Sequence, residues 1–450
     1  MVHDLRANAN RFCASRTLPK LMADFDCPGI AARSVILFCW LSFFPAALCA
    51  EETAPGEEYT GATFETVEQT PEAAPARERE LGAEEDPLEK AKSETEERLQ
   101  EAIERGDLSL YGSIRVRYRQ VNSESIWSDG GSRVGLTGGW NAKPGLRIFG
   151  RAEAGINVLD QIDFLFDRGD RPQGQKFGDT IFLRLLYAGI ERPGMVVTAG
   201  KNWSTFYRVS SFTDRFQGTG ASASGTYNAG TDGGYTGTGR ADRALQARFS
   251  TDRPGRTARF KPLGLGVQVQ YGEPIPRVAD KRYGATIGLS SVYEVENGLA
   301  VGIAYNHASI SDADLVDLRA KGIDGDATAL IIGTRWYGDR WYVGTVVSRL
   351  QNHETTGKGI YFDGTGWEVY SQYRMFGPWW ATAGWNRLKP DGDQTQAGAF
   401  KVDYGVLGIR YSFQDFRQMI FANVRFENGS TQDGKMASDV YTIGVRWDLP

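Results

Sequence analysis

Arginine is the residue type in this sequence with the clearest capacity for chemistry. Several segments alternate apolar with polar residues, and arginines occupy the polar positions: Arg115, Arg117, Arg119, Arg133, Arg147, Arg151, Arg184 and Arg240. Opposing charges across a narrow passage would create a transverse field that orients water and small polar solutes and rejects apolar ones. The alternative is ordinary solvated lumen charge, balanced by acids such as Glu153, Asp214 and Glu368.

Catalytic and metal-binding patterns are missing from the sequence. Its three histidines are His3, His307 and His353, and neither of the last two is part of a cluster with metal-ligand spacing. No serine or aspartate forms a motif with a histidine, and the glycine-rich GTGASASG lacks the lysine and helix of a phosphate-binding loop. We therefore predict no enzyme, no catalytic residue, no cofactor, no metal and no nucleic-acid partner.

The elements that carry the arginines are predicted to be β-strands. In 108–122 the even positions are mostly apolar and the odd ones mostly polar, which is the period of a strand with one apolar face. Sixteen segments show this pattern, and most approach the roughly ten residues of a tilted membrane-spanning strand: 108–122, 132–141, 145–158, 181–191, 194–201, 241–250, 263–271, 282–295, 299–307, 327–337, 341–350, 365–375, 379–387, 400–413, 418–426 and 437–449.

The connections between these segments alternate between tight turns and long polar loops. This alternation is typical of an outer-membrane barrel, with turns in the periplasm and loops outside, although the turn 251–262 is longer than the scheme requires. A soluble sandwich would show the same strand period, but it does not require aromatic residues at strand ends. Here aromatics recur there on the apolar faces, at Trp140, Trp341, Trp367, Trp379, Trp385, Tyr373, Tyr411, Tyr441 and Trp447. We predict an all-β fold, a sixteen-stranded antiparallel transmembrane β-barrel over 107–450.

The longest interruption of the pattern is 202–240, which is rich in Gly, Ser, Thr and Asn and has no periodicity. A loop this long in a compact fold is usually functional or disordered. We predict that it folds back into the lumen and narrows a water-filled pore. The alternative is an exposed, flexible excursion.

The N-terminal region is predicted to be a removed signal peptide, residues 1–50. Its apolar run 34–50 contains Pro45 and ends in small residues, which fits a secretory segment better than a retained anchor, the alternative. Met22 is an alternative start. All four cysteines fall in this segment, so the mature chain would contain no disulfide.

Residues 51–107 differ from the rest in charge, with 19 acids against 6 bases, whereas 108–450 has 34 acids against 40 bases. We predict a disordered acidic linker over 51–85 and a short periplasmic helix over 86–106, which starts at Asp86-Pro87. The narrow apolar stripe of this helix fits either a short coiled coil or a solvated spacer.

Several motifs resemble the general Gram-negative outer-membrane porins over almost the whole of 108–450. They are LYGSIRVRY, SRVGLTG, LRIFGRAEAGIN, TAGKNW followed by FYRVSSFTD, GTGRADRALQAR and YTIGVRW, in this order. The resemblance implies a barrel, usually a homotrimer, in outer-membrane lipid and lipopolysaccharide of a Gram-negative bacterium. It also implies that Arg184 and Arg240 are wall arginines of the constriction and that Asp214 is an acid of the loop.

The sequence departs from the family pattern in two places. RFQGTGAS follows FTD where an acidic stretch is expected, and the chain ends WDLP rather than in an aromatic residue. We therefore expect a passive diffusion channel for small hydrophilic solutes with a weak preference for anions, lined also by Arg115, Arg117, Arg119, Arg133, Arg147, Arg151 and Glu153. The alternatives are a solute-specific channel, or a structural barrel tethered to peptidoglycan through 51–107.

Overall fold

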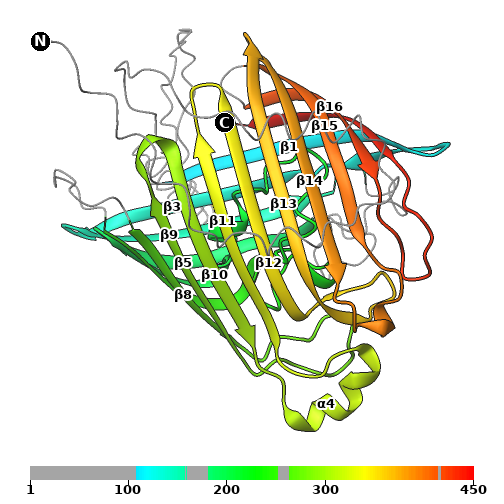
Figure 1. The fold of residues 1–450 in the computed structure, drawn as a ribbon. Coiled ribbons are helices and arrows are strands. Elements are labelled where there is room, and N and C mark those ends of the chain that lie inside the picture. The colour runs from blue at the N-terminus through cyan, green and yellow to red at the C-terminus, as the bar shows by residue number, and fades with distance from the viewer. Residues whose placement is uncertain (1–107, 158, 160–180, 252–262, 414–416, 450) are drawn as a thin grey trace, which may run out of the picture. The chain divides into compact units, whose positions relative to one another are not determined.

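A computed structural model describes residues 108–157, 159, 181–251, 263–413 and 417–449. The predicted signal peptide, acidic linker and short helix lie outside the described residues. The described part forms one antiparallel sheet (Figure 1) of seventeen strands: β1 (Leu108–Val121), β2 (Glu124–Asp129), β3 (Arg133–Lys143), β4 (Leu146–Ile156), β5 (Ile181–Arg192), β6 (Met195–Trp203), β7 (Arg240–Ser250), β8 (Leu263–Tyr271), β9 (Ala285–Glu294), β10 (Leu299–Ala308), β11 (Ala327–Tyr337), β12 (Trp341–Thr355), β13 (Tyr361–Phe376), β14 (Trp379–Pro390), β15 (Val402–Phe413), β16 (Gln418–Glu427) and β17 (Val440–Leu449).

The sheet closes on itself between its first and last strands. β1 pairs antiparallel with β17 from Gly112 opposite Leu449 to Val121 opposite Val440. From β3 to β17 each strand pairs with the next one in sequence, so the ladder hydrogen bonds are made within the wall. This closure excludes the sandwich alternative and confirms the predicted barrel.

β2 and β3 together take the place of a single strand of the barrel wall, next to β1. The second edge of β1 pairs with β2 over Val116 to Val121 and with β3 over Leu108 to Ser113. Between them the Gly130 amide donates to the Arg115 carbonyl at 2.8 Å, which bridges the interruption. The barrel therefore has sixteen wall strands, as predicted, although β2 itself was not predicted.

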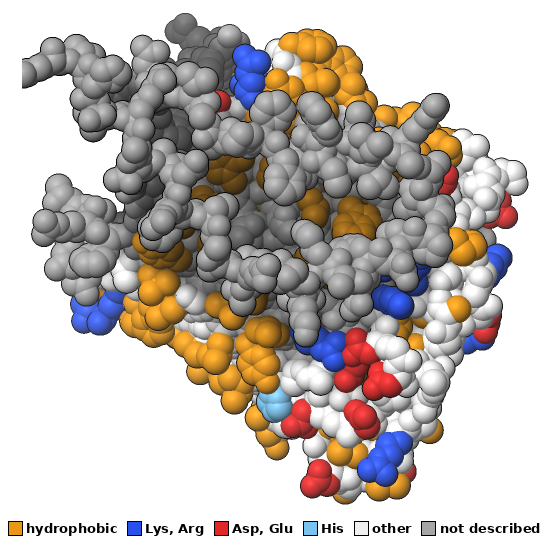
Figure 2. Space-filling model, in the orientation of Figure 1, with side chains coloured by type: hydrophobic (Ala, Val, Ile, Leu, Met, Phe, Trp, Pro, Cys, Tyr) orange, Lys and Arg blue, Asp and Glu red, His pale blue; other side chains and the backbone are white. Residues whose placement is uncertain are grey.

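The two faces of each strand differ as the alternation predicts. Leu110 and Ile114 point outward with 67% and 46% of their surface exposed, whereas Arg117 and Arg119 point inward and are almost fully buried. Outward apolar side chains gather along the strands in the space-filling view, while acidic and basic ones gather at the rim that carries α4 (Asp312–Leu318) (Figure 2). Trp140, Trp341 and Trp367 are among the exposed aromatics, in the positions expected of an interfacial belt.

Several boundaries differ from the sequence prediction. β12 and β13 run several residues further toward the rim of long loops than expected, and residues 282–284 precede β9 instead of belonging to it. The loop predicted at 308–326 contains the helix α4. Its first turn carries Asp312 and Asp314, which suit the positive end of a helix dipole. Leu318 packs in a cluster with Ile275, which lies between β8 and β9, and Tyr361, the first residue of β13, so a small apolar core lies at this rim.

No helix among the described residues is long and apolar enough to cross a membrane.

Barrel closure predicts resistance to detergent. Because the ladder hydrogen bonds are internal to the wall, unheated protein in SDS should stay folded and migrate differently from boiled protein. Electrophoresis of paired samples measures this difference, and circular dichroism should show a β signal with little helix. Identical migration before and after boiling would contradict a stable closed barrel.

Candidate functional site

The segment between β6 and β7, residues 204–239 (the third loop), lies inside the barrel. Its short helix α3 (Tyr207–Ser210) lies against the wall. Val209 of this helix and the flanking Phe206 and Phe212 pack against apolar side chains of β9 to β12. The predicted inward fold of this loop is confirmed, and the alternative of an exposed excursion is wrong.

Small residues on the wall let the loop approach closely. Seven consecutive strands, β8 to β14, each place at least one glycine under the loop, and we call one such residue from each strand the glycine track. A Cβ on Gly366 would lie 1.7 Å from the Ala223 carbonyl oxygen, and one on Gly344 would lie 2.0 Å from the Phe212 carbonyl oxygen. The track consists of Gly266, Gly288, Gly302, Gly333, Gly344, Gly366 and Gly384.

Glu368 of β13 holds the loop on this wall. Its carboxylate accepts hydrogen bonds from the Thr213 hydroxyl at 2.6 Å and from the backbone amides of Ala223 and Ser224 at 2.7 and 2.8 Å. The side chain is fully buried. The expectation that Glu368 balances the lumen charge is therefore wrong, because the carboxylate lies beneath the loop and not toward the open lumen.

The tip of the third loop also contacts the opposite wall. The Gly218 carbonyl accepts hydrogen bonds from Arg117 at 3.2 Å and from Arg119 at 3.0 Å, both on β1. Asn423 of β16 donates to the Gln217 carbonyl at 2.6 Å. The loop thus spans the lumen and narrows it.

A cavity of about 610 Å³ lies between the loop and the wall formed by β1, β2, β3, β5, β7, β16 and β17. Among the described residues its lining includes three aspartates, Asp129, Asp214 and Asp232, and no lysine or glutamate. It also includes eight arginines: Arg115, Arg117, Arg119, Arg133, Arg184, Arg240, Arg425 and Arg446. Positive charge therefore dominates this part of the lumen.

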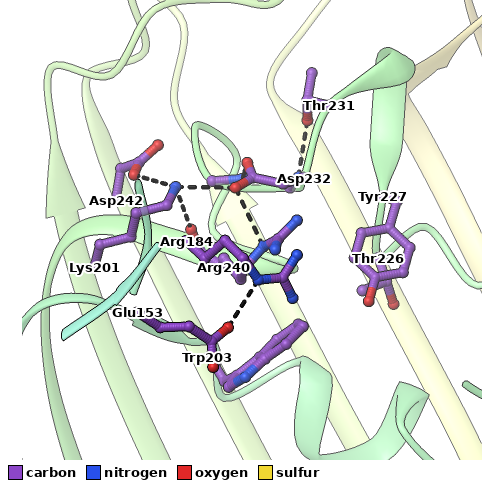
Figure 3. A network of polar contacts seen from close by, with 12 residues as sticks. Glu153, Arg184, Lys201, Trp203, Thr226, Tyr227, Thr231, Asp232, Arg240 and Asp242 are labelled. Carbon is purple, nitrogen blue, oxygen red and sulfur yellow. Dashed lines mark hydrogen bonds and ion pairs between the residues drawn. The ribbon is translucent and has the colours of Figure 1, made fainter. Parts of the chain in front are cut away.

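Four of the eight lining arginines are paired with carboxylates: Arg425 with Glu427, Arg446 with Asp448, and the two that Figure 3 shows. A bulge in β5 directs Arg184 inward, where its guanidinium lies 2.7 Å from the Glu153 carboxylate. Arg240, at the start of β7, lies 3.3 Å from Asp232, which also contacts Lys201 at 3.0 Å. These pairs reduce the field that either arginine alone would exert.

Asp214 of the loop is capped by two tyrosines. Its carboxylate accepts hydrogen bonds from Tyr207 at 2.9 Å and from Tyr227 at 2.7 Å. Burial and then the Asp214 charge raise the pKa of Tyr227 well above its usual value, and the same causes raise the pKa of Tyr207. Both hydroxyls therefore stay neutral donors, and the carboxylate offers less acceptor capacity to a passing cation.

The structure brings together most of the residues predicted for the site. Arg184, Asp214 and Arg240 line one cavity with Arg115, Arg117, Arg119 and Arg133. Glu153 is not among the lining residues, but it pairs with Arg184, which is. Its carboxylate also accepts hydrogen bonds from Tyr111 and Arg151. Arg147 lies away from it, half-exposed and 3.5 Å from Glu191 near the rim of short turns.

Sequence reasoning missed Arg425, Arg446, Asp129, Lys201 and Asp232. The strand alternation contains the signal for Arg446, because its neighbours Val445 and Trp447 point outward. Asp232 lies in the loop, where no period indicates which side chains meet the wall.

Comparisons with known proteins agree with this architecture. A family model described as Gram-negative porin matches residues 91–432. OmpF of Salmonella typhi gives a TM-score of 0.61 at 20% sequence identity, over 76% of this chain and 97% of that chain. The anion-selective porin from Comamonas acidovorans gives 0.53 at 14% identity, over 76% of this chain and 99% of that chain. The outer membrane channel DcaP of Acinetobacter baumannii gives 0.55 at 12% identity, over 76% and 97%.

No sequence among the curated proteins matches the chain. At these identities the structural likeness shows the fold alone, whereas the family match covers most of the chain and fifteen of the sixteen wall strands. The chain therefore belongs to the Gram-negative porin family, and it is a non-enzymatic channel of the outer membrane.

Proposed function

We propose that this porin is a passive diffusion channel for small hydrophilic solutes and ions, with a weak preference for anions. The observation that carries the proposal is the charge of the cavity lining, where the described residues include eight arginines and three aspartates. Carboxylates outside the lining pair with three of these arginines and still leave an excess of positive charge: Glu153 with Arg184, Glu427 with Arg425 and Asp448 with Arg446. Asp232 is paired with Lys201 and Arg240, and Asp214 is capped by two tyrosines. The remaining positive charge raises the local concentration of anions.

We further propose a homotrimer embedded in outer-membrane lipid and lipopolysaccharide, since porins typically form trimers. Large aliphatic side chains are exposed on the outward face of β5, at Ile181, Leu183, Leu186 and Ile190, and they suit contact with lipid or with a neighbouring subunit. We also propose that residues 51–107, a linker over 51–85 and a helix over 86–106, take no part in conduction. Their charge is opposite in sign to that of 108–450. Attachment to peptidoglycan is one role for this region.

Recording from planar bilayers tests the channel directly. Purified protein should give ion steps, and the reversal potential in a KCl gradient at low salt should show chloride passing more readily than potassium. The preference should weaken at high salt, because charges are screened within about 10 Å at 0.1 M ionic strength. A variant lacking residues 51–105 should give the same steps. If the purified protein produced no stepwise increases in current, the proposal of a diffusion channel would be wrong. If potassium passed more readily than chloride, the proposed preference for anions would be wrong.

A further inference from the structure

Five of the arginines that line the cavity form a row on the inward faces of β17, β1, β3, β5 and β7, and we call them the arginine row: Arg446, Arg115, Arg133, Arg184 and Arg240. The register brings the first three close together. Arg115 lies directly opposite Arg446, and Ser113, two residues before Arg115, lies directly opposite Arg133. Three guanidinium groups thus meet on three neighbouring strands.

Carboxylates compensate three members of the row. Arg446 donates to both carboxylate oxygens of Asp448, at 2.9 and 2.5 Å. Arg184 is paired with Glu153, and Arg240 with Asp232. At these three positions the chain itself supplies the anion that a buried guanidinium requires.

Arg115 and Arg133 have no such carboxylate. Arg115 donates from Nε to the Ser113 hydroxyl at 2.8 Å, and its Nη2 is buried without a hydrogen-bond partner. Within the described ranges Arg133 makes no hydrogen bond or ion pair, although it lines the same cavity. The two arginines repel each other and Arg446, while Glu153 attracts Arg133 and Asp448 attracts both, without an ion pair to either arginine in the described part of the chain.

Nearby acids do not satisfy these two arginines. Asp129 lines the cavity, where its Oδ1 accepts the backbone amides of Gly131 and Ser132, at 2.6 and 2.8 Å, and its Oδ2 is buried without a hydrogen-bond partner. No ion pair joins Asp129 to the arginine row among the described residues. Like charges on neighbouring strands destabilise a sheet, and a buried donor without a partner costs free energy. An anion from solution would relieve both costs.

We propose that Arg115 and Arg133 form a discrete binding site for a small oxyanion, either a carboxylate or a phosphate. A guanidinium presents parallel N–H groups that match two oxygens of such a group, which a halide cannot use in the same way. The site rests on the proposed anion preference and goes beyond it. A diffuse positive field attracts every anion, whereas a site binds oxyanions saturably and slows their passage.

The test measures chloride current through single channels while inorganic phosphate or acetate is added. Wild-type protein should show a saturating block of the chloride current. Arg133→Lys keeps the charge but removes the fork of donors. It should retain the chloride preference, while the concentration for half block rises about tenfold, as expected for loss of a charge-assisted, two-point hydrogen bond.

Two controls distinguish a discrete oxyanion site from a diffuse positive field in the lumen. Arg147→Lys makes the same substitution away from the cavity and should leave the block unchanged. The mobility of unheated Arg133→Lys protein in SDS checks that its barrel is intact. Block by phosphate alone assigns a phosphate site, and block by acetate alone assigns a carboxylate site. No block in wild type, or equal block in Arg133→Lys, would overturn the site even if chloride is preferred, whereas a preference for potassium would overturn the proposed function instead.

Discussion

Replacing Arg184 and Arg240 together by glutamine should reverse the ion preference of the channel from anions to cations. The substitutions remove two positive charges and leave the carboxylates of Glu153 and Asp232 with weaker compensation, from Arg151 and Lys201. About 1.4 kcal/mol corresponds to a tenfold preference, and charges about 4 Å apart near a protein surface interact by more than this. We expect the ratio of chloride to potassium permeability to fall at least tenfold.

The reversal potential in a KCl gradient at low ionic strength measures this ratio. The double variant Arg184→Lys with Arg240→Lys conserves the charge and should keep the preference for chloride. Arg147→Gln removes one positive charge near the rim of short turns and should shift the potential only slightly. A double glutamine variant that still prefers chloride would show that other arginines set the selectivity.

Replacing Gly366 by valine should lower the conductance of the open channel. A Cβ at this position would lie 1.7 Å from the Ala223 carbonyl oxygen, so the third loop must move off the wall. The barrel wall blocks movement outward, and the loop shifts into the lumen. The displacement also breaks the hydrogen bond that the Ser348 hydroxyl donates to Ala223 at 2.8 Å. We expect conductance to fall to about half or less, because flow depends on the narrowest part of the pore.

The matched control is Gly405→Val on β15, where the nearest heavy atom to an added Cβ is 3.9 Å away. This variant should conduct as wild type does. Detergent resistance of both proteins distinguishes a displaced loop from a misfolded barrel. Unchanged conductance in Gly366→Val, with an intact barrel, would show that the loop segment near Ala223 does not limit the flow.

The sequence allowed the strands and the face of each arginine to be predicted because the period of two is a local property. The segment that forms β2, ESIWSD, lacks this alternation, and it is a strand because the long β1 offers it an edge. Helix α4 escaped prediction for a similar reason. Only Leu318 of this helix is buried, and it packs with residues such as Ile275 and Tyr361 that lie far away in sequence.

The site residues on the barrel wall could be predicted from the sequence, whereas the contacts of the site residues in the third loop could not. Arg115 and Arg133 follow from alternation, but the partners of Asp214 and Glu368 depend on how an aperiodic loop packs. Tyr227, which caps Asp214, comes thirteen residues later in the chain. One further signal was available in the sequence, since an inward glycine on each of seven consecutive strands indicates a second backbone passing close by.

The contacts at the tip of the third loop bear on the order in which the barrel assembles. The seam between β1 and β17 joins partners such as Ser113 and Asp448, which are 335 positions apart, and contacts of such separation form slowly. The tip binds Arg117 and Arg119 on one side of that seam and Asn423 on β16 near its other side. A loop already seated on the glycine track would therefore hold both ends of the open sheet near each other and act as an internal template for the final strand pairing.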